Sequence, residues 1–134
     1  MIASAAGPIK TWNDQLDDFI VVFNEIDPAL EQIYLGNGID DFTFTYFDPD
    51  TGNVIKEMMI NDEDAYNKVT DDVMQQARAK AQSHLASSVS KNARMKTIAN
   101  EFAKKNTNVV LMYSYLKDDQ KLTKKATITP SEIK

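Results

Sequence analysis

Residues 41–60 read DFTFTYFDPDTGNVIKEMMI, and this stretch decides the fold. In residues 41–47, aromatic side chains alternate with threonines, which is the pattern of a strand with one buried face. Residues 48–53 combine aspartates, a proline, a glycine and an asparagine, all of which favour turns. Residues 54–60 continue as a second strand, so the stretch predicts a β-hairpin.

A second hairpin is predicted near the C-terminus. Residues 109–116 (VVLMYSYL) form the most apolar run of the chain, residues 117–120 turn it, and residues 122–129 (LTKKATIT) read as the partner strand. Both hairpins place an aromatic-rich strand before a turn that contains aspartate, so they look like two copies of one unit. Hairpin chemistry used twice explains the same likeness without a duplication.

Helical spacing precedes each hairpin. Residues 12–26 carry apolar side chains at steps of three and four with acidic side chains between them, which predicts an amphipathic helix. The pair Asp27-Pro28 reads as an N-cap followed by a proline at the first helical position. A break is therefore expected near Asp27, with a short second helix after it.

Before the second hairpin, residues 61–64 supply N-cap oxygens for a long helix whose apolar stripe reaches residue 89. Serines and an asparagine at residues 87–92 are poor helix-interior residues, so the helix is expected to loosen there. A clean apolar stripe then resumes and ends near residue 105, where lysines face the negative end of the helix dipole.

These elements predict an α+β fold with the order α-β-β-α-β-β. Its two helix-hairpin units are expected to form one four-stranded antiparallel sheet with the helices packed on one face. Residues 11–134 are expected to form a single domain, and residues 1–10 a disordered tether or a remnant of cloning. The side chains expected in the core include Phe19, Phe23, Phe44, Tyr46, Ile98, Phe102, Leu111 and Tyr113.

Composition excludes several classes of protein. The chain has 134 residues, of which 43% are hydrophobic and 26% charged, as is usual for one globular domain. Having no cysteine, it has no disulfide, thiolate metal site or Cys nucleophile. No run approaches the roughly 20 apolar residues that cross a bilayer, and residues 1–10 lack the pattern of a signal peptide. We therefore expect no cofactor, and membrane association only through a removed N-terminal anchor.

Charge is distributed unevenly along the sequence. Residues 12–64 contain 14 acidic residues against one lysine, and residues 65–134 contain 13 Lys and Arg against six acids. Such asymmetry indicates either a charged surface for a partner or two halves that neutralise one another in the fold. The acidic first helices carry no nearby Lys or Arg in the sequence, although like charges three or four positions apart destabilise a helix.

No motif carries catalysis convincingly. His84 is the one histidine, and the adjacent Ser83 points away from it on a helix, so a partly exposed helix residue is the better interpretation. Ser88 and Lys91 have the Ser-x-x-Lys spacing of some acyl-transfer enzymes but lack the companion motifs. We expect no enzymatic activity and no catalytic residue, with a hydrolase of unknown type as the third hypothesis.

Metal and nucleic-acid sites are equally weak. Asp48, Asp50 and Asn53 hint at a calcium loop, but the glycine and glutamate positions of an EF-hand do not fit, and turn formation explains these residues. No metal site is expected. The lysines near the second hairpin could hold phosphates, but a sequence pI of about 4.8 opposes binding to polyanions. Lysines on a strand also discourage edge-to-edge aggregation.

The order of the predicted elements resembles that of small secreted lipoprotein domains of unknown function from Gram-positive bacteria. A helix comes first, then the aromatic hairpin (residues 42–60), a long polar helix, and a closing hairpin with Tyr113-Ser114-Tyr115 and a lysine-rich last strand. The resemblance covers most of residues 12–129. It implies an extracytoplasmic location in the cell envelope and an N-terminal lipidated cysteine, which this chain lacks.

We therefore predict a non-catalytic binding or inhibitory module of the bacterial cell envelope that acts on a protein partner, a basic one if the acidic surface is used. A sheet face, the hairpin loops and the acidic helix surface are the candidate contact regions. A cytosolic or phage-borne regulatory protein is the alternative, and the oligomeric state stays open. The predicted partner-binding residues are Asp14, Asp17, Asp18, Glu25 and Glu31.

Overall fold

The computed structural model describes residues 12–47 and 53–134, and the side chains of residues 12–13 and 45–47 lie outside this description. The predicted tether at residues 1–10 also lies outside it. The elements are α1 (Trp12–Asn24), α2 (Asp27–Gly36), β1 (Phe42–Phe47), β2 (Asn53–Ile60), α3 (Glu63–Asn67), α4 (Asp71–Lys91), α5 (Ala93–Lys105), β3 (Asn108–Lys117), β4 (Gln120–Ile128) and the 3-10 helix η2 (Pro130–Glu132). No helix within the described ranges is long and apolar enough to span a membrane.

The four strands form one mixed sheet in the order β1-β2-β3-β4. Both predicted hairpins are confirmed, since β1 pairs antiparallel with β2, and β3 with β4. The prediction of a fully antiparallel sheet is wrong, because β2 and β3 run parallel from Asn53↔Asn108 to Ile60↔Tyr115. The three helices between β2 and β3 are the reason: they carry the chain back to the starting end of β2, as a crossover between parallel strands requires.

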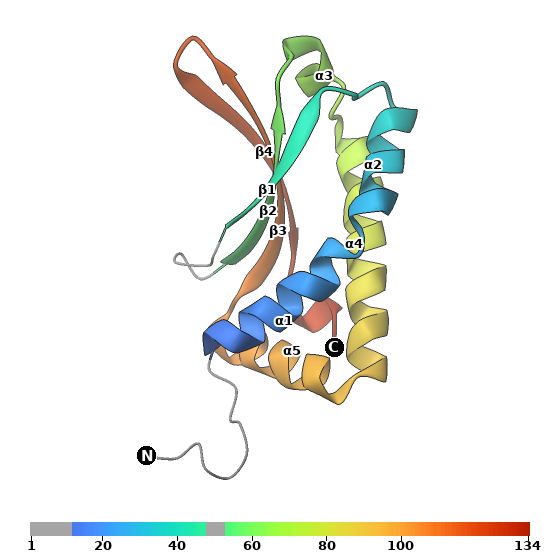
Figure 1. Ribbon diagram of the computed structural model, residues 1–134, viewed down its shortest axis with the longest axis vertical. Coiled ribbons are helices and arrows are strands. Elements are labelled where there is room, and N and C mark those ends of the chain that lie inside the picture. The colour runs from blue at the N-terminus through green and yellow to red at the C-terminus, as the bar shows by residue number, and fades with distance from the viewer. Residues whose placement is uncertain (1–11, 48–52) are drawn as a thin grey trace.

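The helices lie to one side of the sheet (Figure 1). Helix α4 runs along this side, α1 and α5 cross near its lower end, and the far end of the β3–β4 hairpin projects from the body of the molecule. Strand alternation sends Val54, Met58 and Tyr113 to the helix-covered face, where each is almost fully buried. This face is called the inner face below, and the opposite face the outer face.

The break between α1 and α2 is confirmed, with a different capping residue from the one predicted. Ile26 occupies the N-cap position of α2 and makes no side-chain cap, and Pro28 lies in the first turn. Asp27 therefore belongs to the helix. Its carboxylate instead pairs with Lys56 of β2.

The long polar helix is divided in two. Asp62 caps the short α3, and Thr70 caps α4 through a bond of 3.3 Å from the backbone N–H of Val73. Between them, Lys124 Nζ donates to the carbonyl oxygens of Tyr66 and Val69 at 2.9 and 2.8 Å. In a continuous helix, backbone N–H groups further along the helix would bond to these carbonyls. Here a side chain of β4 takes their place.

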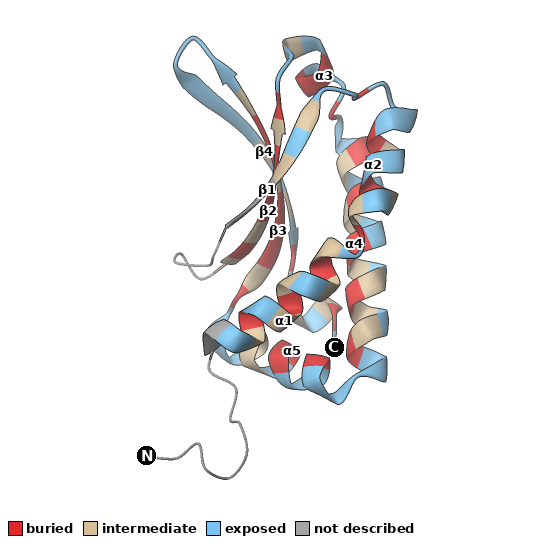
Figure 2. Cartoon of the chain, in the orientation of Figure 1, coloured by how far each residue is buried: buried red, intermediate tan, exposed pale blue. Residues whose placement is uncertain are grey.

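The predicted loosening near residue 90 is a true helix end. Helix α4 stops at Lys91, and the Asn92 side chain caps α5 by accepting from Arg94 N at 2.9 Å. Figure 2 shows buried residues along the sides of the helices that face the sheet and one another. Phe19 and Phe102 join α1 to α5 with ring centroids 4.7 Å apart.

Six of the eight predicted core residues are buried, one is half-buried, and one has a side chain outside the described part. The six that are buried are Phe19, Phe23, Ile98, Phe102, Leu111 and Tyr113. Phe44 is half-buried and packs against this core, and the side chain of Tyr46 lies outside the described part.

Candidate functional site

The predicted acidic surface lies on α1 and α2. Asp14, Asp17 and Glu31 are exposed, while Asp18 is half-buried. Val21 lies in the same stripe of α1 and is 63% exposed. A single exposed apolar side chain is ordinary on a protein surface, so Val21 alone does not mark an interface.

Glu25 and Asp18, both predicted partner-binding acids, contact side chains from other helices. Glu25 Oε1 lies 3.0 Å from His84 Nε2 of α4, and Asp18 Oδ2 lies 3.7 Å from a guanidinium nitrogen of Arg94 in α5. The halves of the chain therefore interleave and neutralise one another in part. His84 and Arg94 lie far from the acids in sequence, and helix packing brings them there.

His84 is a partly exposed helix residue, as predicted. Its partner is the carboxylate of Glu25. Beside this pair, Lys80, Ser83 and Ser87 help to line a shallow hollow of about 310 Å³ between α4 and the α1–α2 junction. Within the described residues no serine hydroxyl is bonded to His84, so a Ser-His pair is not assembled here.

The calcium-loop hypothesis is only partly open to inspection. Asp48 and Asp50 lie outside the described residues. Asn53 Oδ1 accepts a hydrogen bond of 3.3 Å from the backbone N–H of Asn108, so it links β2 to β3. Across the residues that the structure describes, no three histidine or acidic side chains gather in a way that could hold a metal ion.

Two neighbouring charged residues of β2 are buried on opposite faces, and sequence reasoning missed both. On the inner face, Lys56 is 2% exposed and its Nζ donates to Phe23 O at 3.2 Å, to Asn24 Oδ1 at 3.4 Å and to Asp27. The ammonium also lies 4.3 Å from the centre of the Phe23 ring. Burial lowers the pKa of Lys56, and the Asp27 carboxylate opposes that shift.

On the outer face, Glu57 is 2% exposed and lies at the centre of a polar cluster. Its Oε2 accepts from Ser114 Oγ of β3 at 2.5 Å and pairs with Lys121 Nζ of β4 at 2.8 Å. Ser114 is fully buried, whereas the Lys121 side chain is 46% exposed. A sequence signal for this cluster existed, because two charges in the middle of a strand of apolar residues demand partners.

Apolar side chains surround the polar cluster on the outer face. Val110 is 5% exposed, and Leu116 is 60% exposed near the end of β3. Ile55, Met59 and Met112 are half-buried on the same face. In the part of the chain that the structure describes, no helix packs over them (Figure 1).

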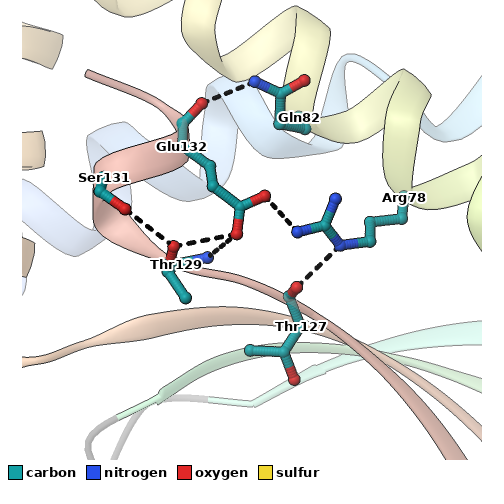
Figure 3. A network of polar contacts seen from close by, with 6 residues as sticks. All are labelled: Arg78, Gln82, Thr127, Thr129, Ser131 and Glu132. Atoms are coloured by element: carbon teal, nitrogen blue, oxygen red, sulfur yellow. Dashed lines mark hydrogen bonds and ion pairs between the residues drawn. The ribbon is translucent and has the colours of Figure 1, made fainter.

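A second polar network ties the C-terminus to α4 (Figure 3). Arg78 Nε donates to Thr127 O of β4 at 2.8 Å, and its guanidinium pairs with Glu132. Glu132 Oε1 also accepts from the backbone N–H of Thr129 at 3.2 Å, which closes a capping box at the start of η2. This hydrogen bond, followed by those from the Thr129 hydroxyl and Arg78, lowers the pKa of Glu132 despite partial desolvation.

Comparisons of the chain with protein-family models, curated proteins and solved structures find no match. The candidate surfaces are therefore judged on their own chemistry. They are the acidic surface of α1 and α2, the outer face of the sheet, and the exposed edge of β4.

Proposed function

We propose that this chain is a non-catalytic binding module of the bacterial cell envelope, and that it meets a protein partner through the outer face of its sheet. The observation that carries the proposal is a sheet face with half-buried apolar side chains and no described helix over it. A sheet face that no helix covers usually carries polar residues. Here Ile55, Met59 and Met112 lie around a buried carboxylate.

The mixture of groups on this face also supports binding. Interfaces combine an apolar centre with a polar rim, and methionines adapt to irregular partner surfaces. Leu116 offers an exposed apolar side chain next to half-buried ones, and Lys121 and Lys125 supply the rim toward β4. The envelope location rests on the resemblance of the sequence to secreted lipoprotein domains.

The pairings of the titratable groups support a role without catalysis. His84 is bonded to a glutamate on the helix surface, and Ser114 is fully buried beside Glu57. A nucleophile must reach its substrate, so a fully buried serine is poorly placed for covalent chemistry. The Glu57 cluster instead holds three strands of the sheet together.

A matched pair of substitutions tests the proposal. The partner is first captured from an envelope extract of the host on immobilised protein, identified by mass spectrometry and purified. Leu116→Glu on the outer face and Leu35→Glu on α2 then introduce the same change at two exposed leucines. We expect Leu116→Glu to weaken binding at least about ten-fold, because an unpaired charge enters the interface, and Leu35→Glu to leave the affinity unchanged.

Circular dichroism and a melting curve check that both variants keep the parental fold. Loss of binding in Leu35→Glu with retention in Leu116→Glu would move the interface to the helices and contradict the proposal for the outer face. Equal affinity in all three proteins would contradict both surfaces.

A further inference from the structure

The backbone of β4 exposes a free edge over part of its length. Strand β4 is the last strand of the sheet, and it follows a two-residue turn whose residues Asp118 and Asp119 have φ of 49° and 66°. In such a primed turn the flanking residues, here Lys117 and Gln120, form a hydrogen-bonded pair. Hydrogen-bonded and non-hydrogen-bonded pairs then alternate along the hairpin. The residues of β4 that direct their backbone groups away from β3 are therefore Lys121, Thr123, Lys125 and Thr127.

Two contacts support this alternation. Thr127 O accepts a hydrogen bond of 2.8 Å from Arg78 of α4, on the side away from β3. The same alternation directs the backbone groups of even-numbered β3 residues toward β2. The backbone N–H of Asn108 follows it, because it donates to Asn53 of β2. Arg78 thus occupies one end of the edge, and in the described residues no hydrogen bond is found on the outward backbone groups of Lys121, Thr123 and Lys125.

A groove runs beside this edge. It has a volume of about 400 Å³ and lies between α4 and the last residues of β4. Helix α4 contributes Met74, Gln75 and Arg78, and β4 contributes Lys125 and Thr127. The helix therefore stands back from the strand beside Lys125, leaving space next to the outward backbone groups of that residue.

We propose that the edge of β4 from Lys121 to Lys125 takes an extended segment of the partner protein as an added strand, and that this segment carries acidic residues four positions apart. The inference rests on the proposed function, because the added strand would enlarge the outer face that meets the partner. Main-chain hydrogen bonds give such an addition its affinity, and alternate side chains give it specificity.

Charge selects the acidic segment. Lys121 and Lys125 are both exposed, and they flank Thr123 on the outer face. A strand paired with β4 would place its own residues opposite these lysines at a spacing of four. Opposite charges at such cross-strand positions stabilise pairing, and like charges destabilise it.

The same charges disfavour a second copy of this chain. Two β4 edges that paired antiparallel about Thr123 would place Lys121 of each copy opposite Lys125 of the other. Parallel pairing in register would place each lysine beside its own counterpart. Lysines in this position protect natural sheets against such pairing, so the edge favours an acidic strand over itself.

Fluorescent peptides provide the test. The probe is an acetylated peptide, Ser-Val-Glu-Val-Thr-Val-Glu-Val-Ser, and the control peptide has lysine in place of both glutamates. Affinity for the full chain is measured by fluorescence anisotropy at low and high salt, and backbone amide exchange is followed with and without peptide. We expect the acidic peptide alone to bind, and to slow exchange at Lys121, Thr123 and Lys125.

Three variants separate backbone pairing from charge attraction. Lys125→Glu should weaken the acidic peptide at least about ten-fold, whereas Lys96→Glu on α5 makes the same charge change at another exposed lysine and should not. Lys121 is left intact because it holds Glu57. Thr123→Pro removes an outward N–H that the sheet does not use, so it should abolish binding while circular dichroism stays parental.

Other results overturn the added strand. Equal binding of both peptides, or unchanged amide exchange on binding, contradicts it, and the exchange readout stands even if Thr123→Pro does not fold. Weakening by Lys125→Glu without any protection of the edge amides would indicate charge attraction alone. Self-association of the wild type that Thr123→Pro removes would assign the edge to a second copy. In each case the proposed function is tested separately, by the affinities of Leu116→Glu and Leu35→Glu for the captured partner.

Discussion

Lys56 and Glu57 are neighbours in β2, and both are almost completely buried, yet they point to opposite faces of the sheet. The ammonium of Lys56 bonds to the α1–α2 junction, so on the inner face a buried charge fixes helices to the sheet. The carboxylate of Glu57 bonds to Ser114 of β3 and Lys121 of β4, so on the outer face a buried charge joins strands to one another. The inner face is thus covered by helices, and the outer face is a sheet surface that carries both polar and apolar groups.

The largest expected effect tests whether the two faces differ in packing. Phe23→Ala on the inner face should lower the free energy of unfolding by about 3 to 5 kcal/mol, because it opens a cavity among fully buried rings. Met112→Ala on the half-buried outer face is the matched truncation and should cost well below that. Urea unfolding followed by circular dichroism measures both. Similar losses of stability in the two variants would contradict the difference between the faces, because they would show that the outer face is packed as tightly as the core.

The second prediction concerns the two buried charges themselves. Lys56→Met keeps most of the side-chain volume but removes three hydrogen bonds at the end of α1 and the start of α2, so it should cost about 1 to 3 kcal/mol. Glu57→Gln keeps an acceptor for Ser114 and weakens the attraction to the half-exposed Lys121, which should cost less than about 1 kcal/mol. A larger loss for Glu57→Gln in urea unfolding would reverse this order.

The third prediction uses pH to weaken the inner face alone. The hydroxyls of Tyr34 in α2 and Tyr113 in β3 lie 2.9 Å apart, and burial raises the pKa of both, that of Tyr113 to about 12. Because the folded-state pKa lies above the unfolded value, this contribution is complete below about pH 10 and is lost as pH rises through the folded value. Between pH 10 and 12, the free energy of unfolding should fall by about 1.4 kcal/mol per pH unit for each tyrosine.

The lowered pKa of Lys56 acts with the opposite sign, but only up to about pH 10.5, where the unfolded lysine also loses its proton. Urea unfolding at pH 9, 10, 11 and 12 measures the slope. Tyr34→Phe should flatten it by about 1.4 kcal/mol per pH unit, since one titrating hydroxyl is gone while Tyr113 and Tyr66, whose pKa burial also raises, still titrate. A slope that Tyr34→Phe leaves unchanged would place the alkaline weakening elsewhere.

The sequence predicted the elements better than their connections. The hairpins and helices could be predicted because each depends on residues that are close in the chain. The signals were alternating aromatic residues, turn residues and apolar stripes at helical spacing. The parallel pairing of β2 with β3 depends on how three helices return the chain, and no local pattern encodes that direction. The division of α3 from α4 depends on Lys124, more than 50 residues away, whose ammonium replaces helical hydrogen bonds.

The candidate site was predictable to a smaller extent. The acidic side of α1 could be predicted from spacing, but its partners His84 and Arg94 could not, since helix packing brings them there. Glu57 and Ser114 lie 57 positions apart and carry no motif. Only the register of a parallel pair, which the sequence did not reveal, places them side by side.

The smallest expected effect on stability lies on the outer side of the helices that cover the inner face. Asp14→Asn, Asp17→Asn and Asp18→Asn together should change the free energy of unfolding by no more than about 0.5 kcal/mol for each substitution, because Asp14 and Asp17 are exposed and the half-buried Asp18 lies 3.7 Å from a guanidinium that is itself exposed. If a basic region of the partner approaches this surface, the triple variant should associate more slowly, and its association rate should depend less on ionic strength.

The control carries the same charge change at exposed aspartates elsewhere, namely Asp40→Asn, Asp118→Asn and Asp119→Asn. Stopped-flow association at several salt concentrations distinguishes the two. Equal slowing in both triple variants would reduce the effect to net charge, whereas slowing in the first alone would make α1 a second contact that steers the partner toward the sheet.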